Sequence, residues 1–277
     1  MDELSIIKEF CDNPTFLPQV SERTMNFINK AALMAYNTPN CRKELAEQML
    51  NAITPTIEFN VNPKPPKKIN GFAPRINPEI MLDTWRKDRH IDVDGWEYDI
   101  IPEGTILFRG DDSKYGFHKR ATYYTPLFKV SNMYINKTKK GYIQVLSTTK
   151  DLKTFRIDSL NNINKILQLT YNENKKLYRI LLGFFGQGKH VKDNSLPLPP
   201  HVERIGRVSS PKEDFVFANW LCDNGFQGYS AGFIISLGSF PDEVMICDGL
   251  GVLRLEKLIH TKRLVLEEDY QRLKELI

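Results

Sequence analysis

The sequence predicts an α+β fold in which a helical N-terminal part precedes a mixed domain. Before residue 54, apolar residues recur every three or four positions, which is the spacing of one helix face. After about residue 91, short apolar runs alternate with turn residues, as they do in strands. The chain has 277 residues, and 41% of them are hydrophobic, which is enough to bury a core. We therefore expect a helical region over residues 1–90 and an α+β domain over residues 91–277.

Two helices are expected in the first third of the chain. Ser21–Tyr36 places its apolar residues on one face, and Ser21 is a suitable N-cap. Asn40–Ile53 repeats this spacing with Asn40 as its N-cap, and Pro55 ends it. These helices carry no residues of recognisable chemistry, so a regulatory part and a docking surface for a partner are both open.

A proline-rich segment follows over residues 57–78. Prolines favour extended backbone, so we expect a linker or a strap across the surface. Lys64, Lys67 and Lys68 within it either contact a phosphate or solvate the linker, and solvation is the commoner use of such a cluster. Pro78–Lys87 is then expected to form a short helix.

The elements expected after residue 91 come in a mixed order. Five strands are expected first, over Tyr98–Ile101, Thr105–Arg109, Ala121–Tyr124, Tyr142–Ser147 and Thr154–Ile157. Three helices follow, over Leu160–Leu169, Lys175–Phe185 and Lys212–Asp223. Three late strands and a last helix are expected over Gln227–Ile235, Glu243–Asp248, Val252–Leu255 and Glu267–Ile277. Runs of strands followed by runs of helices are typical of α+β domains.

Composition and the first residues exclude several classes of protein. No apolar stretch reaches the roughly 18 residues that a membrane-spanning helix needs. The start, MDELSIIKEF, lacks the positive charge and apolar run of a secretory signal. A net charge of +4 is too small to indicate a partner. The richness in Lys, Asn and Ile is that of AT-rich coding, as in some large DNA viruses, so we expect the host cytoplasm or the virion as the location.

Histidines and cysteines show no metal-binding pattern. None of the five histidines lies four positions from another. The cysteines contain no C-x-x-C pair, and they are Cys11, Cys41, Cys222 and Cys247. We therefore expect no metal site, and we expect four reduced, buried thiols in a cytosolic protein.

The strand expected at Thr105–Arg109 ends in residues suited to a planar ligand. Gly110 follows Arg109, and a glycine lets a flat ligand approach the main chain closely. An arginine at this place can hold a phosphate or a ribose hydroxyl. Taken alone, the segment is also an ordinary strand that runs into a turn.

Two tyrosines and a serine follow at helical spacing. Tyr123 lies on an expected strand, and Ser131 and Tyr134 come 8 and 11 positions later, on a helix expected after it. Two rings from two elements can sandwich a planar heterocycle, and a serine between them can bond an exocyclic amide. The alternative is a pair of ordinary half-buried tyrosines.

An acidic residue, Glu243, begins an otherwise apolar late strand. It lies downstream of the glycine-punctuated segment Gly225–Ala231. A carboxylate at the start of a strand usually faces solvent, so Glu243 alone does not indicate a site.

Taken in chain order, these segments resemble the ADP-ribosyltransferase fold, and most closely its poly(ADP-ribose)-polymerase-like branch. In that branch a G-x-Y-F segment is followed by a serine and then by a second tyrosine. Ala121-Thr122-Tyr123-Tyr124 is similar to that segment, and Ser131 and Tyr134 fall at the matching offsets. Phe108-Arg109-Gly110 stands at the place of a His-Gly motif, and Glu243 stands at the place of the catalytic glutamate. The resemblance covers residues 95–260.

The resemblance implies a split β-sheet domain that uses NAD. Nicotinamide would lie between two tyrosines with its amide on a glycine and a serine, and the arginine would reach a phosphate. The implied NAD-binding residues are Arg109, Gly110, Tyr123, Ser131 and Tyr134. Glu243 would be the catalytic carboxylate, because breaking the ribose–nicotinamide bond builds positive charge on the ribose. The ADP-ribose would pass to a protein or nucleic-acid acceptor.

The chain departs from the family pattern at two places, and two other functions stay open. Arg109 stands where the tyrosine-bearing branch has histidine. Pro241 stands where arginine-modifying members have the first glutamate of E-x-E, which argues against arginine as acceptor. The basic run Lys137–Lys140 indicates instead a non-catalytic structural or nucleic-acid-associated virion protein. A 2′-phosphotransferase acting on RNA ends would need several basic residues in its cleft, and only Arg109 and Arg207 are candidates.

Overall fold

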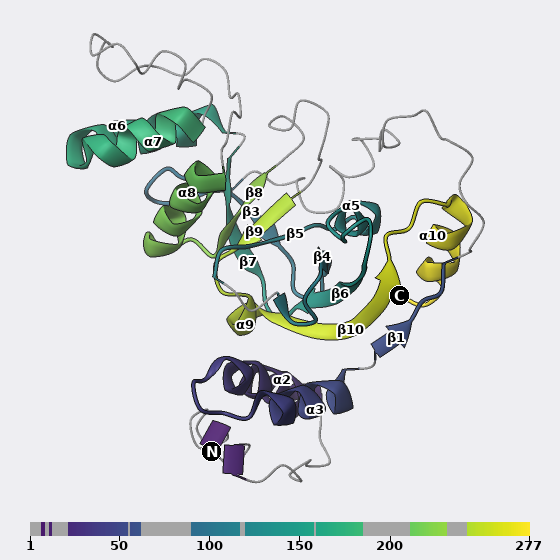
Figure 1. Ribbon diagram of the computed structural model, residues 1–277. Coiled ribbons are helices and arrows are strands. Elements are labelled where there is room, and N and C mark those ends of the chain that lie inside the picture. The colour runs from purple at the N-terminus through teal and green to yellow at the C-terminus, as the bar shows by residue number, and fades with distance from the viewer. Residues whose placement is uncertain are drawn as a thin grey trace.

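The computed structural model describes residues 7–8, 11–12, 22–54, 56–61, 90–116, 120–157, 159–184, 211–231 and 243–277. Within these ranges the chain is α+β, with two β-sheets and helices packed around them (Figure 1). The expected helix at Pro78–Lys87, the cluster of Lys64, Lys67 and Lys68, and Arg207 all lie outside the described residues.

Two N-terminal helices are present where the apolar spacing predicted them. They are α2 (Glu22–Asn37) and α3 (Lys43–Ile53). The N-cap prediction for the second helix is wrong, because α3 begins after Arg42 and Asn40 has a positive φ of 72° in the turn before it. The helix ends at Ile53, and the N–H of the C-cap residue Thr54 donates to the Leu50 carbonyl.

A four-stranded sheet has the order β1-β10-β6-β4. These strands are β1 (Thr56–Glu58), β10 (Leu253–Lys262), β6 (Lys140–Thr148) and β4 (Ile106–Asp111). β1 is parallel to β10, with Thr56 opposite Leu258, so the start of the expected linker is an edge strand. β6 is antiparallel to both of its neighbours, β10 and β4.

A six-stranded sheet has the order β2-β3-β7-β8-β9-β5. These strands are β2 (His90–Ile91), β3 (Glu97–Ile101), β7 (Leu152–Arg156), β8 (Gly228–Ala231), β9 (Glu243–Ile246) and β5 (Thr122–Tyr124). It meets the four-stranded sheet through the backbone bridge between Phe108 and Thr125. Their N–H groups bond each other's carbonyl at 2.7 and 2.9 Å.

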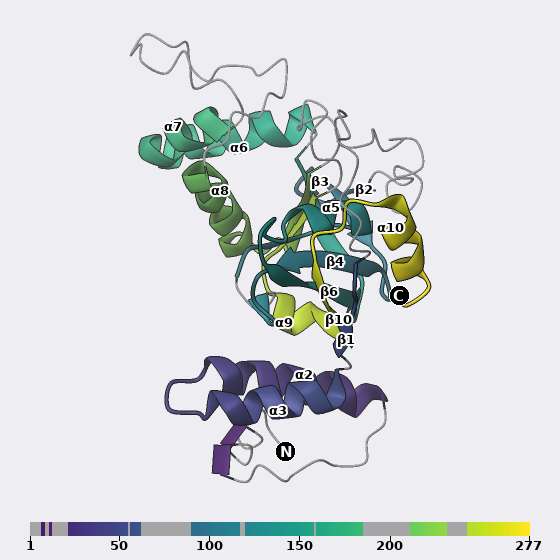
Figure 2. The ribbon, with the colours of Figure 1, turned by 45° about the vertical axis from the view of Figure 1, so that its right-hand side comes forward.

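Helices cover the outer faces of both sheets, as Figures 1 and 2 show. The helices that follow α3 in the described ranges are α5 (Phe128–Met133), α6 (Leu160–Glu173), α7 (Lys175–Phe184), α8 (Pro211–Asp223), α9 (Gly249–Val252) and α10 (Glu267–Lys274). α6, α7 and α8 pack on the six-stranded sheet through Phe155, Phe217 and Tyr229. No helix in the described part of the chain is both long enough and apolar enough to cross a bilayer.

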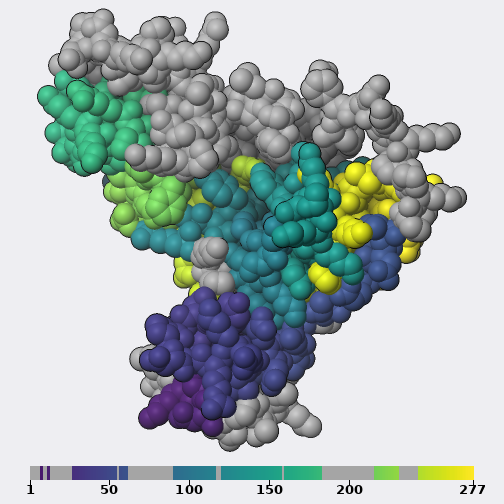
Figure 3. Space-filling view, viewed as in Figure 1, coloured from purple at the N-terminus to yellow at the C-terminus, as the bar shows by residue number. Residues whose placement is uncertain are grey.

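The N-terminal helices share a hydrophobic core with both sheets. Ile28 and Leu50 from the helices pack with Leu107 and Leu146 of the four-stranded sheet and with Val244 of the six-stranded sheet. Figure 3 shows the helices as a lobe in contact with the body of the molecule. Burial of such side chains stabilises a fold by roughly 1.5–3 kcal/mol each. Residues on both sides of position 90 therefore contribute to one core.

The expectation of four reduced thiols is wrong. Cys11 is bonded to Cys41, and Cys222 is bonded to Cys247, with Cα–Cα distances of 5.4 and 5.5 Å. The partners lie 30 and 25 positions apart in the sequence. The spacing of the cysteines in the sequence could not identify these pairs, because only the folded chain brings α8 to the end of β9 and Cys11 to the turn before α3.

Candidate functional site

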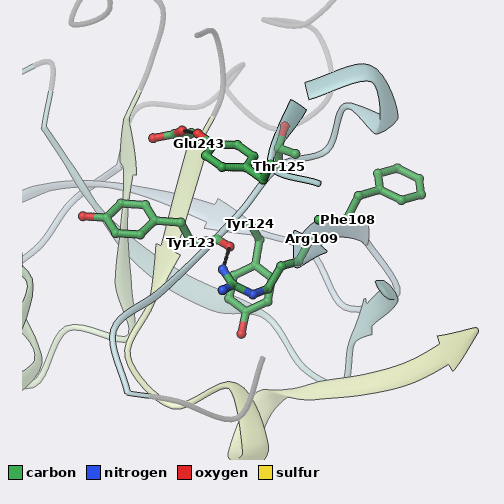
Figure 4. A pocket seen from close by; sticks show the side chains of 8 residues that line it. Phe108, Arg109, Tyr123, Tyr124, Thr125 and Glu243 are labelled. Atoms are coloured by element: carbon green, nitrogen blue, oxygen red, sulfur yellow. Dashed lines mark hydrogen bonds between the residues drawn. The ribbon is translucent and has the colours of Figure 1, made fainter. Parts of the chain in front are cut away.

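A small pocket lies where the two sheets meet. Its cavity volume is about 30 Å³, and its lining residues are Phe108, Arg109, Gly110, Tyr123, Tyr124, Thr125, Tyr134 and Glu243 (Figure 4). They come from β4, from β5, from the end of α5 and from the start of β9. This volume is about that of one water molecule and lies far below the roughly 300–1,000 Å³ of ligand pockets, so a heterocycle would enter only after the lining side chains move.

Five of the six predicted site residues line this pocket, and Ser131 does not. The five are Arg109, Gly110, Tyr123, Tyr134 and Glu243. Ser131 is fully buried in α5, and its hydroxyl donates to the Phe128 carbonyl at 2.8 Å. A serine in a helix readily satisfies its hydroxyl on the preceding turn, which removes it from a ligand. The sequence offset alone could not show this.

Gly110 has a packing role in addition to its place in the lining. A Cβ atom on Gly110 would lie 1.9 Å from the Ser131 carbonyl oxygen and 3.4 Å from the Tyr134 Cβ. Only glycine therefore lets α5 lie this close to β4. The close approach that the sequence indicated is made here by the backbone of a helix.

Glu243 and Tyr134 form the polar contact of the pocket. Tyr134 is the C-cap residue of α5, it is half exposed, and its hydroxyl donates to Glu243 Oε1. Glu243 begins β9 and pairs with Ala231 of β8 through the backbone. The carboxylate thus lies on the wall of a pocket next to an aromatic ring, held by a sheet register and a hydroxyl.

Tyr123 is held by a residue that the sequence did not single out. Its hydroxyl lies 2.7 Å from that of Tyr229, and the two rings meet edge to face with centroids 6.1 Å apart. Tyr229 is fully buried among the side chains of α8 and β7. It lies in the glycine-punctuated segment Gly225–Ala231, which was the available signal, although no spacing rule linked it to Tyr123.

Tyr124 points to the opposite side of β5 from Tyr123. Its ring is buried in the core that the N-terminal helices share with the sheets. Burial raises the pKa of the Tyr124 phenol well above its ordinary value, and the nearby Arg109 opposes that shift. Tyr124 therefore stays protonated and forms the apolar floor of the pocket.

Arg109 joins the two sheets beside the pocket. One guanidinium nitrogen donates to the Tyr123 carbonyl at 3.0 Å, and the other donates to Asp111 Oδ2 at 2.7 Å. Figure 4 shows Arg109 lying beside Tyr124 with the bond to Tyr123 drawn. Its Nε is buried and finds no partner in the described part of the chain. The side chain that was expected to reach a phosphate is thus bound to backbone and to a carboxylate of its own strand.

Comparison with known proteins gives no match to any family model, curated protein or solved structure. Among the residues that the structure describes, no three His, Cys, Asp or Glu side chains are grouped in a way that could hold a metal ion.

Proposed function

We propose that this chain is an NAD-dependent ADP-ribosyltransferase that transfers ADP-ribose to a protein or nucleic-acid acceptor. The observation that carries the proposal is the contact between the Tyr134 hydroxyl and the Glu243 carboxylate in the pocket that Tyr123 and Gly110 also line. These residues come from four separate elements, and their order in the chain is that of the family the sequence resembles.

Cleavage of NAD requires a carboxylate beside the ribose, and Glu243 has a suitable position in the pocket. Cleavage of the bond between ribose and nicotinamide builds positive charge on the ribose, as glycoside cleavage does. The Glu243 carboxylate stabilises that charge, and it does so more strongly as the charge develops. The Tyr134 hydroxyl holds the carboxylate in position, and Tyr124 keeps the pocket floor dry.

The residues present fit the nicotinamide end of NAD in part. Tyr123, Tyr134 and Glu243 line a cavity of about 30 Å³, so a nicotinamide ring would enter only after these side chains move apart. Ser131 keeps its hydroxyl inside α5, so the amide of nicotinamide would rely on backbone groups near Gly110. Arg109 already donates to Asp111 and to the Tyr123 carbonyl, so a phosphate would have to share the guanidinium with these two acceptors.

A labelled-NAD transfer assay tests the proposal together with a thermal-shift titration of NAD and nicotinamide. The wild-type chain should show a shift with both ligands and should transfer label. Glu243→Gln should abolish transfer and leave most of the NAD-induced shift. Glu268→Gln, on the exposed first turn of α10, changes the same chemical group and should behave as wild type. If Glu243→Gln lost binding and turnover equally, Glu243 would not be the catalytic residue.

The chief alternative is a non-catalytic, nucleic-acid-associated protein. The exposed lysines at Lys137, Lys139 and Lys140 favour it. A chain that shows no thermal shift with NAD or nicotinamide but binds nucleic acid would be of this class. A 2′-phosphotransferase fits less well, because Arg109 is the one basic side chain that the structure places in the pocket lining, and two acceptors already engage it.

For the location we propose the virion rather than the host cytoplasm. Disulfides persist in oxidising surroundings and on virions, whereas the cytosol keeps thiols reduced. The bonds Cys11–Cys41 and Cys222–Cys247 support this choice.

A further inference from the structure

Four exposed lysines gather at one end of the four-stranded sheet, and we name them the lysine patch. They are Lys137, Lys139, Lys140 and Lys262. β6 begins at Lys140 and β10 ends at Lys262, and the register places these two residues directly opposite each other. Cross-strand partners in such a pair have Cβ atoms about 5 Å apart. The other two lysines precede Lys140 within three positions, so all four charges lie close together.

Most of this charge is not neutralised by the protein. Glu58 accepts a bond from Lys140 at 3.2 Å. Asp112 lies next to the segment that precedes Lys137, where its Oδ1 accepts a hydrogen bond from the Asn136 N–H. In the described ranges no carboxylate pairs with the other three lysines of the patch. Like charges held this close are unfavourable unless an anion joins them, so the patch fits a polyanion.

Aromatic rings flank the lysine patch on both sides. Tyr134, half exposed on the pocket wall, lies three residues before Lys137 and so within about 10 Å of it. Tyr142 and His260 stack with ring centroids 4.6 Å apart. They share the sheet face of Lys140 and Lys262, because alternate residues of a strand face the same way. Lysines interleaved with rings are the pattern that binds single-stranded nucleic acid, whose bases stack on the rings.

We infer that the lysine patch binds the phosphate backbone of a single-stranded nucleic acid and presents a nucleotide of it to the pocket as the ADP-ribose acceptor. The second half of this inference rests on the proposed function. The connection is Tyr134, because the same residue lines the pocket and begins the segment that leads to the patch. A nucleic-acid strand bound along Lys137 and Lys139 would pass the mouth of the pocket beside Glu243.

The transfer step balances without a further reactant. The bond between the ribose anomeric carbon and nicotinamide breaks, and its electron pair leaves with nicotinamide, which becomes neutral. An oxygen or nitrogen of the nucleotide forms the new bond to that carbon and releases its proton to water. The products are an ADP-ribosylated strand, nicotinamide and one proton.

Fluorescence anisotropy with labelled oligothymidylate and oligouridylate, in the absence of NAD, tests the surface by itself. Wild-type binding should weaken steeply as salt is raised. In the double variant Lys139→Gln/Lys262→Gln the slope of log affinity against log salt should be shallower by about 1.4, since each single-strand contact contributes about 0.7. The control Lys150→Gln/Lys176→Gln removes the same charge beyond the other end of β6 and on α7, and it should keep the wild-type slope. The two oligonucleotides distinguish DNA from RNA.

Equal slopes in the patch variant and the control would overturn the inference. Equal affinity for an acidic polypeptide such as polyglutamate would overturn it too, because the surface would then bind any polyanion. Transfer from labelled NAD to the oligonucleotide tests the second half. The patch variant should lose labelling of the strand but still release nicotinamide from NAD through Glu243. Nicotinamide release without any strand labelling in wild type would overturn the acceptor and leave the proposed function standing, whereas strand binding without nicotinamide release would overturn the proposed function.

Discussion

The hydroxyl of Tyr134 donates a hydrogen bond to the carboxylate of Glu243, although 109 positions separate the two residues in the sequence. One residue ends α5 and the other begins β9, so the contact ties the two elements across the pocket mouth. A hydrogen bond to a charged group is usually stronger than one between neutral groups. The contact therefore fixes where negative charge lies in the pocket.

Tyr134→Phe should lower the turnover number by about tenfold, which is the lower range for losing a hydrogen bond to a charged group. The ring stays, so the affinity for nicotinamide should change little. Steady-state kinetics of nicotinamide release would measure both quantities. Tyr171→Phe, on α6 and remote from the pocket lining, serves as the control. A variant with normal turnover and weakened binding would assign Tyr134 to ligand contact rather than to positioning Glu243.

A double-mutant cycle on Tyr123 and Tyr229 should give a coupling energy of about 1 kcal/mol. Their hydroxyls lie 2.7 Å apart, and one of them is fully buried, so each single change to Phe removes the same bond. Urea unfolding of wild type, both single variants and the double variant provides the four free energies. Strictly additive losses would mean that the bond contributes nothing to the stability of the fold.

Replacing Cys222 and Cys247 together by serine should lower the free energy of unfolding by about 3 kcal/mol, because their bond closes a loop of 25 residues in the unfolded chain. Reductant should destabilise wild type more than this, because it also opens the Cys11–Cys41 bond, and it should have little effect on a variant that lacks all four cysteines. Mass spectrometry of unreduced peptides would identify the pairs directly. Pairing of Cys11 with Cys222 would contradict the structure.

Acid should loosen the first strand of the four-stranded sheet. The bond from His260 at 2.5 Å, followed by that from Lys140, holds the pKa of the Glu58 carboxyl below its ordinary value of 4.5. A lowered pKa contributes stability above the ordinary value, and that contribution is lost as pH falls through the folded pKa. The pair is exposed, so the effect should be at most about 1 kcal/mol.

The free energy of unfolding of wild type and of Glu58→Gln should be measured from about pH 7 to about pH 3. This range spans the ordinary pKa of a carboxyl group. The difference between them should be largest near neutrality and should vanish in acid. Glu103→Gln, an exposed carboxylate for which the structure shows no basic partner in the described residues, should parallel wild type throughout. A difference that grew on acidification would contradict the assigned sign.

Periodicity predicted the elements whose signals are local. The strands expected at Tyr98–Ile101 and Tyr142–Ser147 are confirmed as β3 and β6, and both long helices after them are confirmed as α6 and α7. The sequence did not predict β1, because this strand is stabilised by pairing with β10, about 200 residues later. The residues around Thr56 carry no local signal for that pairing.

The pocket residues likewise fall into those that the sequence predicted and those that depend on contacts between distant parts of the chain. The residues that local spacing linked, Tyr123 and Tyr134, both line it, as does Glu243. Ser131 has the expected offset, but its hydroxyl donates to a carbonyl in the preceding turn of its own helix. Tyr229 was not predicted, because it contacts Tyr123 from a strand that is distant in the sequence. Which atoms a polar side chain satisfies is decided by packing that a one-dimensional pattern does not contain.

The core that α2 and α3 share with the two sheets determines which pieces of the chain can be produced. A fragment that starts at residue 91 would keep every pocket residue but would expose Leu107, Leu146 and Leu258 to water, and β10 would lose β1 as its neighbour. An unpaired edge above an uncovered apolar face invites aggregation. Expression trials that trim the first ninety residues should therefore yield insoluble material, and an inactive fragment of this kind would say nothing about the chemistry of the pocket.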